Sequence, residues 1–545
     1  MPYTTAWKRC TPAQLAFAIQ VFSLVAIFFE GYDQGVMGGV NSSPDYVQTV
    51  GIGEYPSGKI TSTVHQGGIV SIYCASWSRH RCGRSTCPKS HFIYAADLGA
   101  IVGSFAGGWF ADVVGRINGV FVGATFALIG GALQAATQSS NFILVARVVT
   151  GLGTGALVGI VPVYVAEVSK ADHRGQFLGY VFIANYLGIS LAYWLDFGLQ
   201  FINHGLSPVR WRFLLGFQCI PAIILLAGIK LLPDSPRYLV SVGRESEALE
   251  VLQHIRGDTA EAVRAEMAEM VESSKGASRT SPAAVFTVLS GRSKNTLHRH
   301  LGRRAWLCIW LQIMGSWTGI TAVTTYSPIL LAQAGYSATT QAGLAGGINT
   351  IGIIGTIISA NLIDPFGRRK SFMVGSLCLA IINAIAGGLF QLSISHPSRA
   401  ASVAPGAVLM LFLFNLAYAS TWGTLAFLIP TEIFPSEMRA QGNAFGITGW
   451  AIGVGWTTLI NPLLFSTLEN KSYFLFAALN LVWIPIIYLF YPETSGRSLE
   501  SVTHLFDRGC LNSEMEAAYA SALDYTPRVG SDNEKAEKGT QRQLE

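Results

Sequence analysis

The segment Asp112-Val-Val-Gly115-Arg116 recurs in the pattern acid-x-x-Gly-Arg as Asp364-Pro-Phe-Gly367-Arg368, 252 residues further along the chain. Each copy lies between two apolar stretches of about 20 residues. A motif that recurs at a large fixed offset is typical of a duplicated unit. The recurrence therefore predicts that the chain consists of two similar halves.

Two further pairs of motifs recur in the same order and at nearly the same offset. They are Glu167 with Arg174 and Glu432 with Arg439, seven residues apart in each pair and offset by 265, and Pro233-Asp234-Ser235 with Pro492-Glu493-Thr494, offset by 259. Three ordered pairs at nearly one offset are not expected by chance. They support the prediction of two pseudo-symmetric halves.

The composition is that of a membrane protein. Half of the 545 residues are apolar and only 13% are charged, against roughly 25% in a soluble protein. The apolar residues gather in runs of about 20, the length with which a helix crosses about 30 Å of hydrocarbon. The 58 glycines and 21 prolines suit membrane helices that pack closely and bend. An all-α membrane protein is predicted.

Twelve apolar stretches divide into six and six. They lie near residues 13–38, 92–111, 119–137, 142–165, 176–199, 211–232, 305–331, 341–363, 370–392, 405–430, 442–466 and 472–491. When the spans alternate in direction, the basic loops all fall on one side of the membrane. The positive-inside rule then predicts that both termini are cytoplasmic.

These spans divide the chain into five parts. The parts are a cytoplasmic N-terminus at 1–12, an N-terminal six-helix half at 13–232, a cytoplasmic helical linker at 233–304, a C-terminal six-helix half at 305–491 and a cytoplasmic tail at 492–545. The linker contains amphipathic segments, which are typical either of a solvated connection or of a gating element.

Residues 74–97 do not fit the first half. Between Ser78 and Lys89 the stretch holds four Arg and Lys residues, which hydrocarbon does not accept without partners, and Pro88, which stops a helix. One interpretation is an inserted piece, such as an unremoved intron in the gene. The alternative is a long, basic external loop.

Two pseudo-symmetric halves predict transport by alternating access, with a solute site between them near the bilayer midplane. The repeated acidic and basic residues fall at cytoplasmic helix ends, where inter-helix ion pairs would hold the outward-open state. The candidates for these gating pairs are Asp112, Arg116, Glu167, Arg174, Asp364, Arg368, Glu432 and Arg439. The alternative is that the arginines only orient the helices.

An ordered set of motifs extends from about residue 13 to about residue 500. It includes Gly31-Tyr32-Asp33-Gln34-Gly35, Pro162-Val-Tyr164-Val-Ala-Glu167, Pro233-Asp-Ser-Pro236-Arg237, Pro430-Thr-Glu432-Ile-Phe-Pro435 and Pro492-Glu-Thr-Ser-Gly496-Arg497. In these motifs the chain resembles the sugar porter family of the major facilitator superfamily, and fungal members above all. The resemblance implies the twelve-helix major facilitator fold and sugar transport across a plasma membrane.

Asp33 and Arg147 are charged residues inside predicted spans, where charge is costly and is a sign of function. Burial favours the protonated form of Asp33, and a nearby guanidinium favours its anion. A change in this pair during transport would couple proton uptake to solute uptake, the role that the resemblance also implies. The alternative is a static structural pair. Glu30 lies on nearly the same helix face as Asp33, where it would either repel that carboxylate or face a watery vestibule.

The amides with which sugar porters usually bind pyranoses are largely absent here. The resemblance places the fifth-span Gln position at Phe182, the seventh-span Gln pair at Gly315 and Ser316, and the tenth-span Trp at Phe427. The remaining candidates for solute contact are Asn185, Gln312, Ser316, Trp317, Thr321, Asn349, Trp422 and Phe427. Each of them is equally compatible with a role in helix packing.

The expected function is proton-coupled symport of a sugar or polyol. Passive facilitated transport and a non-transporting nutrient sensor are the alternatives. The sequence has no Walker loop and no nucleophile–base constellation, so no enzyme and no cofactor is expected. The eight cysteines lack metal-ligand spacing, so no metal is expected either. The expected partners are a sugar or polyol, a proton and the lipid bilayer, and nucleic acid is not among them.

Overall fold

The protein is described by a computed structural model, which covers residues 5–52, 96–169, 174–256, 260–274, 296–333, 335–396, 400–434, 439–468, 471–495, 497, 501–506 and 511–525. All regular elements within these ranges are helices. The predicted insert at 74–97 lies outside the described residues, except for its last two, which begin a helix.

The helices of the first half follow the apolar stretches closely. They are α1 (Pro12–Val40), α4 (Ala96–Val114), α5 (Arg116–Ala135), α6 (Ser140–Val168), α7 (Arg174–Leu199) and the successive pair α8 (Pro208–Phe217) and α9 (Cys219–Gly228). Turn chemistry sets several of their ends. Thr11 and Gln14 form a reciprocal capping box at the start of α1, and Ser139 caps α6.

The second half repeats this order. It comprises α14 (Thr296–Gly315), η5 (Ser316–Ile320), α15 (Thr321–Gln333), α16 (Ala338–Phe366), α17 (Arg368–Ser395), α18 (Ala400–Tyr418), η7 (Ala419–Gly423), α19 (Thr424–Ile433), α20 (Arg439–Thr467) and α21 (Lys471–Phe490). Two of its spans are continuous in direction but broken by π-helical turns, η5 in the seventh span and η7 in the tenth. The predicted twelve-span, two-half fold is confirmed.

Ten helical segments of the described residues are long and apolar enough to cross a membrane. The other two spans are α4, whose apolar part is Gly99–Val114, and α20. Polar residues are tolerated in α20 because it lies inside the bundle, where Gln441, Asn443 and Asn461 are buried. Its neighbours there are α14, α4 and α6.

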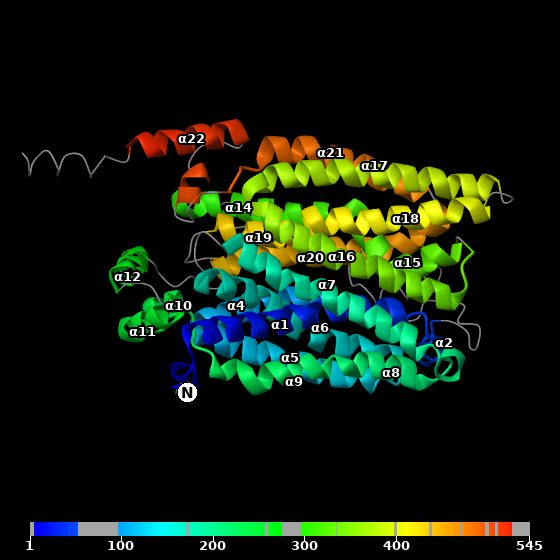
Figure 1. Cartoon of the computed structure of the whole chain (residues 1–545), viewed down its shortest axis with the longest axis horizontal. Coiled ribbons are helices and arrows are strands. Elements are labelled where there is room, and N and C mark those ends of the chain that lie inside the picture. Colours follow the sequence, from blue (N-terminus) through cyan, green and yellow to red (C-terminus); the bar gives the residue numbers. More distant parts are fainter. Residues whose placement is uncertain are drawn as a thin grey trace, which may run out of the picture.

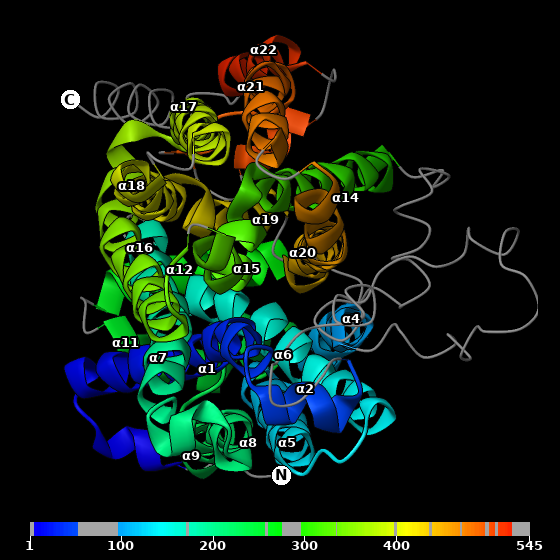
Figure 2. The same cartoon turned by 90° about the vertical axis from the view of Figure 1, so that its right-hand side faces the viewer.

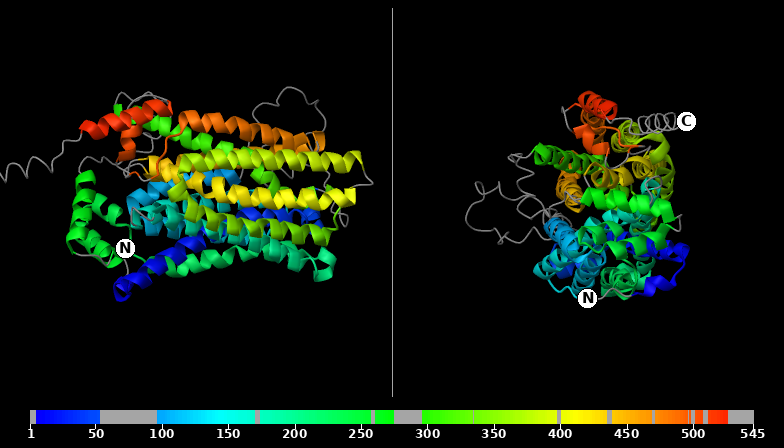
Figure 3. Two further views of the ribbon diagram at one scale, coloured as in Figure 1. Left: turned by 45° about the horizontal axis from the view of Figure 1, so that its top comes forward. Right: turned by 90° about the vertical axis from the view of Figure 1, so that its left-hand side faces the viewer.

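The helices run along the long axis of the molecule, and the two halves lie side by side (Figures 1 and 3). Viewed along this axis, the first half lies below the second, and α7 faces α16 across the boundary (Figure 2). The short helices α10 (Pro236–Ser241), α11 (Glu245–Arg256) and α12 (Ala260–Ser274) lie at one end, here called the linker end. The N-terminal residues and α22 (Asn512–Tyr525) lie at the same end (Figure 1). The small helix α2 (Pro44–Val50) marks the opposite end.

The helices α1 and α7 touch through their backbones. A Cβ added to Gly31 would lie 2.0 Å from the carbonyl oxygen of Asn185, and one added to Gly188 would lie 2.4 Å from that of Phe28. Neither position accepts a side chain without displacing a helix, because Cβ atoms do not approach backbone atoms below 3.0 Å. This contact fixes the height of α7 against α1 and so positions the residues of the candidate site.

The linker packs against the first half in its described part. Arg256 of α11 donates hydrogen bonds to the carbonyls of Val168 at 2.7 Å and Ser169 at 3.4 Å, at the end of α6. It also pairs with Glu266 of α12 at 2.7 Å. The sequence left open whether the linker is a solvated connection or a gating element, and these contacts tie it to the span that carries Glu167.

Candidate functional site

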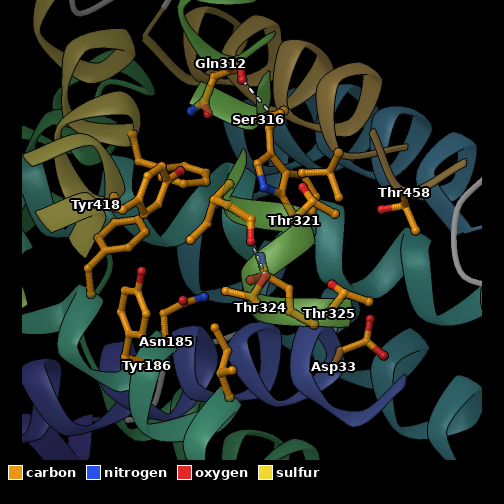
Figure 4. Close-up of a pocket in the computed structure, with 18 of the residues that line it drawn as sticks. Asp33, Asn185, Tyr186, Gln312, Ser316, Thr321, Thr324, Thr325, Tyr418 and Thr458 are labelled. Carbon is orange, nitrogen blue, oxygen red and sulfur yellow. Dashed lines mark hydrogen bonds between the residues drawn. The ribbon is translucent and has the colours of Figure 1, made fainter. Parts of the chain in front are cut away.

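A cavity of about 150 Å³ lies between the two halves. Its wall is formed by α1, α6 and α7 on one side and by the seventh, eighth, tenth and eleventh spans on the other. The lining residues are Asp33, Gln34, Met37, Arg147, Phe182, Asn185, Tyr186, Ile189, Gln312, Ser316, Ile320, Thr321, Thr324, Thr325, Thr356, Tyr418, Gly423, Thr424, Phe427, Trp450, Val454 and Thr458. In Figure 4 the residues of α1 and α7 face those of the seventh span across this space.

An ion pair lies in the wall that belongs to the first half. Nη1 of Arg147 donates to Oδ1 of Asp33 at 2.9 Å, and Arg147 is only 3% exposed. Nε and Nη2 of Arg147 are buried and have no hydrogen-bond partner among the described residues. The carboxylate is therefore held by a single charge-assisted bond. A second strong contact is open to Arg147 if the helices shift.

A second carboxylate lies behind the same wall. Glu30 is 2% exposed and accepts hydrogen bonds from the amide nitrogens of Asn185 and Gln34, both of which line the cavity. Of the two roles expected for Glu30, a watery vestibule does not match this burial. Its partners are cavity amides from two helices.

The wall of the second half is rich in hydroxyl and amide groups. Gln312 donates to the carbonyl of Ala426 at 3.0 Å, in the tenth span. Ser316 donates to the carbonyl of Gln312 at 3.0 Å, and the hydroxyls of Thr457 and Thr321 are 3.0 Å apart. These polar groups have protein partners, and the hydroxyls retain acceptor capacity toward the cavity.

Aromatic rings close the cavity toward the linker end. The rings of Phe182 and Phe427, one from each half, stack with centroids 5.0 Å apart. Tyr186 and Tyr418 also line the cavity, and the hydroxyl of Tyr186 donates to Asn415 of the other half at 3.3 Å.

Both ends of the cavity are bridged by contacts between the halves. Toward the linker end, Asn443 donates to the carbonyls of Val158 at 3.1 Å and Gly159 at 3.0 Å. Toward the opposite end, Tyr193 donates to the carbonyl of Thr324. There the hydroxyls of Ser190 and Thr350 also lie 2.6 Å apart. Described residues of the two halves are therefore in contact on both sides of the cavity.

Two equivalent charge clusters stand at the linker end. In the first half, Arg116 contacts Glu167 at 3.1 Å and pairs with Asp112, while Asp234 accepts from its backbone N–H at 2.9 Å. The charge of Arg439, from the other half, also attracts Glu167.

In the second half, Arg368 contacts Glu432 at 3.0 Å and Asp364 at 2.9 Å, and Glu493 accepts from its backbone N–H at 2.9 Å. The three repeated motifs thus meet in one cluster in each half. The side chain of Arg174 lies outside the described part of the chain, and Arg439 is buried.

A model of the family described as "Sugar (and other) transporter" matches residues 18–506. The chain belongs to this sugar transporter family. Family membership makes it a multi-pass membrane transporter and not an enzyme.

Individual relatives of this transporter agree with that family assignment. It is 28% identical to "Sugar transporter STL1" of Saccharomyces cerevisiae, over 92% of this chain and 83% of the relative. It is also 28% identical to "MFS-type transporter criB" of Aspergillus cristatus, over 90% and 94%. Identity to the "Galactose-proton symporter" of Escherichia coli is 30%, over 76% and 84%.

Among solved structures, the proton:xylose symporter XylE bound to 6-bromo-6-deoxy-D-glucose matches with a TM-score of 0.70. The match covers 91% of this chain and 99% of that one, at 21% identity. At this identity the match establishes the major facilitator fold. The match does not identify the solute of this transporter.

The predicted solute candidates divide into two groups. Asn185, Gln312, Ser316, Thr321 and Phe427 line the cavity, together with Asp33 and Arg147. Trp317, Asn349 and Trp422 are not among the lining residues.

These three residues lie in helix packing, and Trp317 is partly buried against the hydrophobic core. Trp422 is fully buried, donates to Ser376 at 3.1 Å and packs on Phe372. Asn349 donates within its own helix, to Ala345 at 2.9 Å.

Several lining residues are not among those predicted from the sequence. They are Gln34, Tyr186, Thr324, Thr325, Thr356, Tyr418, Trp450 and Thr458. Gln34, Thr324 and Thr325 were predictable in principle, because each lies within one helical turn of a predicted site residue, either Asp33 or Thr321. Trp450 was not predictable, since a Trp in an apolar span is typical of a lipid contact. Among the described residues there is no group of His, Cys, Asp and Glu able to hold a metal ion.

Proposed function

We propose that this transporter is a proton-coupled symporter of a monosaccharide or linear polyol, which works by alternating access in the plasma membrane. The observation that carries the proposal is the buried Asp33–Arg147 pair in the cavity wall. The N-terminus, the linker and the C-terminal tail are proposed to be cytoplasmic, which makes the linker end the cytoplasmic end.

The proposed coupling follows from the chemistry of this pair. When Asp33 is ionised, its contact with Arg147 compensates two charges that burial disfavours. When Asp33 takes up a proton, that contact weakens and Arg147 is free to turn its unpartnered edge elsewhere. A proton and a solute in the same cavity then change the preferred arrangement of the halves together, which is the requirement for coupling.

Two similar proteins support the proposal of proton coupling, although their names describe only those proteins. One is named as a galactose-proton symporter and one solved neighbour as a proton:xylose symporter.

The cavity supports a small, polyhydroxylated solute. A volume of about 150 Å³ favours a small solute over a disaccharide. Hydroxyls and amides line one part of the wall, while Phe182, Phe427 and Trp450 offer ring faces for C–H groups. The wall lacks several amides that the family resemblance leads one to expect, so D-glucose is not assumed to be the solute.

The two charge clusters are proposed to act as gates at the linker end. Each joins three elements of one half through a buried arginine. Opening this end would separate the halves there and change the surroundings of Glu167, which lies near Arg439.

The test is uptake by a yeast strain that lacks its own sugar transporters. The panel is radiolabelled D-glucose, D-galactose, D-xylose, D-sorbitol and glycerol at pH 5 and pH 7, with and without a protonophore. The wild type is expected to accumulate at least one solute uphill, and more at pH 5. Asp33→Asn is expected to abolish accumulation while equilibrative uptake persists.

The matched control is Asp196→Asn. Asp196 is also a buried acid paired with an arginine, Arg210 at 2.8 Å, but it does not line the cavity. Accumulation is expected to survive in this variant. Undiminished accumulation by Asp33→Asn would overturn the coupling. If the protonophore does not change uptake by the wild type, transport is passive. If the wild type takes up none of the solutes, a non-transporting sensor is indicated.

A further inference from the structure

We infer that Glu30 is a positioning residue of the solute site, which holds the amides of Asn185 and Gln34 with their oxygens toward the cavity as acceptors for solute hydroxyls. The inference rests on the proposed function and narrows its substrate class to solutes that donate hydrogen bonds from their hydroxyls.

The contacts of Glu30 divide evenly between its two oxygens. Nδ2 of Asn185, on α7, donates to Oε2, and Nε2 of Gln34, one turn along α1, donates to Oε1. Glu30 itself is 2% exposed and is not part of the cavity lining, whereas both amides are. The carboxylate therefore acts on the cavity through the two amides.

Glu30 and Asp33 are neighbours with different partners. Asp33 has the guanidinium of Arg147, whereas no ion pair within the described ranges involves Glu30. A buried carboxylate without a cation is costly unless hydrogen bonds satisfy it. The two amide donors supply that need, so the amides are bound firmly in one orientation.

The backbone holds this arrangement in place. Gly31 follows Glu30 directly and lies against the backbone of Asn185 itself, since an added Cβ would be 2.0 Å from that carbonyl oxygen. The side chains of Glu30 and Asn185 thus extend from two backbones in contact. Neither helix is able to slide without breaking the pair.

The orientation has a chemical consequence for the solute. A primary amide has two N–H donors and one carbonyl acceptor. One N–H of each amide is bound by Glu30, so the carbonyl oxygen of each amide is directed away from that carboxylate and is the acceptor that Asn185 and Gln34 offer to a ligand. Such a wall offers two carbonyl acceptors to the hydroxyls of a solute.

The test is Glu30→Gln, with kinetics on whichever of D-glucose, D-galactose, D-xylose, D-sorbitol and glycerol the wild type takes up fastest. The new amide brings an N–H₂ group against the N–H₂ group of a neighbour, so one cavity amide has to turn its oxygen away. KM is expected to rise about tenfold, as for one or two lost hydrogen bonds, with uphill accumulation kept.

The double variant Glu30→Gln/Asn185→Asp distinguishes orientation from packing. It exchanges the carboxylate and the amide between α1 and α7, so one oxygen at position 185 accepts from position 30 and the other still faces the cavity. KM is expected to return to within about threefold of the wild type. Glu250→Gln, at an exposed glutamate of α11 that pairs with Lys8, is the control that leaves KM unchanged.

Three results would overturn the inference: an unchanged KM in Glu30→Gln, loss of accumulation with KM kept, or no rescue by the double variant. If Glu30→Gln does not reach the membrane, Asn185→Ala carries the same expectation, a higher KM with accumulation intact, and an unchanged KM overturns it. If the wild type takes up a solute and Glu30→Gln has the same KM for it, only this inference is refuted. A wild type inert toward the whole panel refutes the proposed function as well.

Discussion

Arg116 and Arg368 occupy equivalent positions in the two halves and make equivalent contacts. Each binds an acid four residues before it and a glutamate of a neighbouring span, and each has its backbone N–H bound by an acid after the last span of its half. The repeat of the sequence is thus a repeat of contacts. An arginine that only oriented a helix would have no need of three buried or half-buried acids.

Removing Arg116 is expected to cost far more than removing an exposed arginine. In Arg116→Gln, Glu167 stays 3% exposed but loses its closest cation, and a buried charge left in this way costs about 3–5 kcal/mol. Arg244→Gln, which breaks an exposed pair with Glu247, should cost about 0–1 kcal/mol. Fluorescence-detected size exclusion after heating in detergent compares them. Equal melting temperatures would contradict a structural role of the cluster.

At the scale of single residues, the sequence located the charged pair that lies in the cavity wall and, among eight solute candidates, five residues that line the cavity. Asp33 and Arg147 were identifiable because charge in a span requires a reason. Trp317 and Trp422 were predicted as stacking surfaces and do not line the cavity. A span is apolar toward both lipid and protein, so its periodicity does not show which face meets the cavity. Ser316 lines the cavity while Trp317, its neighbour, does not.

At the scale of elements, the twelve spans were predictable because each is a long apolar run whose ends carry Pro, Gly or a capping hydroxyl. The breaks within them were not. The seventh span turns at Gly319, with φ of +107°, inside the π-helical η5, and the tenth contains η7. An extra residue in a turn rotates everything after it by about 100°. Both breaks lie beside the cavity, where unwound backbone is typical of transporter sites.

The contact of α1 with α7 is the element-scale feature that the solute site requires. Gly31→Ala places a methyl group 2.0 Å from a backbone oxygen, so the helices have to separate, at an expected cost of about 1–3 kcal/mol. Gly388→Ala in α17 is the matched control, since nothing lies within 4 Å of its added Cβ. Gly388→Ala should raise the free energy of unfolding by up to about 1 kcal/mol, because alanine has a higher helix propensity than glycine. Thermal stability in detergent measures both, and an equal response would refute the close contact.

At the scale of the whole molecule, the structure is a balance between two sets of bridges. Asn443 holds the halves together toward the linker end and Tyr193 toward the opposite end, with the cavity between them. Alternating access requires that one set breaks while the other holds. The repeat predicted the halves and the position of the site between them. It did not predict the bridges, because these residues differ between the halves and have no counterpart in the repeated motifs.

Weakening one set of bridges should therefore open one end in preference to the other. Asn443→Ala removes two hydrogen bonds toward the linker end, and Tyr193→Phe removes one toward the opposite end. At about 1 kcal/mol for each bond, the populations shift by about fivefold for one bond and up to about 30-fold for two, in opposite directions. The reporter is Thr325→Cys, in the cavity wall, in a background without other cysteines. With an impermeant maleimide added outside intact cells, labelling should slow in Asn443→Ala and quicken in Tyr193→Phe, because the linker end is proposed to be cytoplasmic.

If both variants change the labelling rate in the same direction, the two bridges do not act as opposed gates. If both directions are inverted, the proposed orientation in the membrane is wrong.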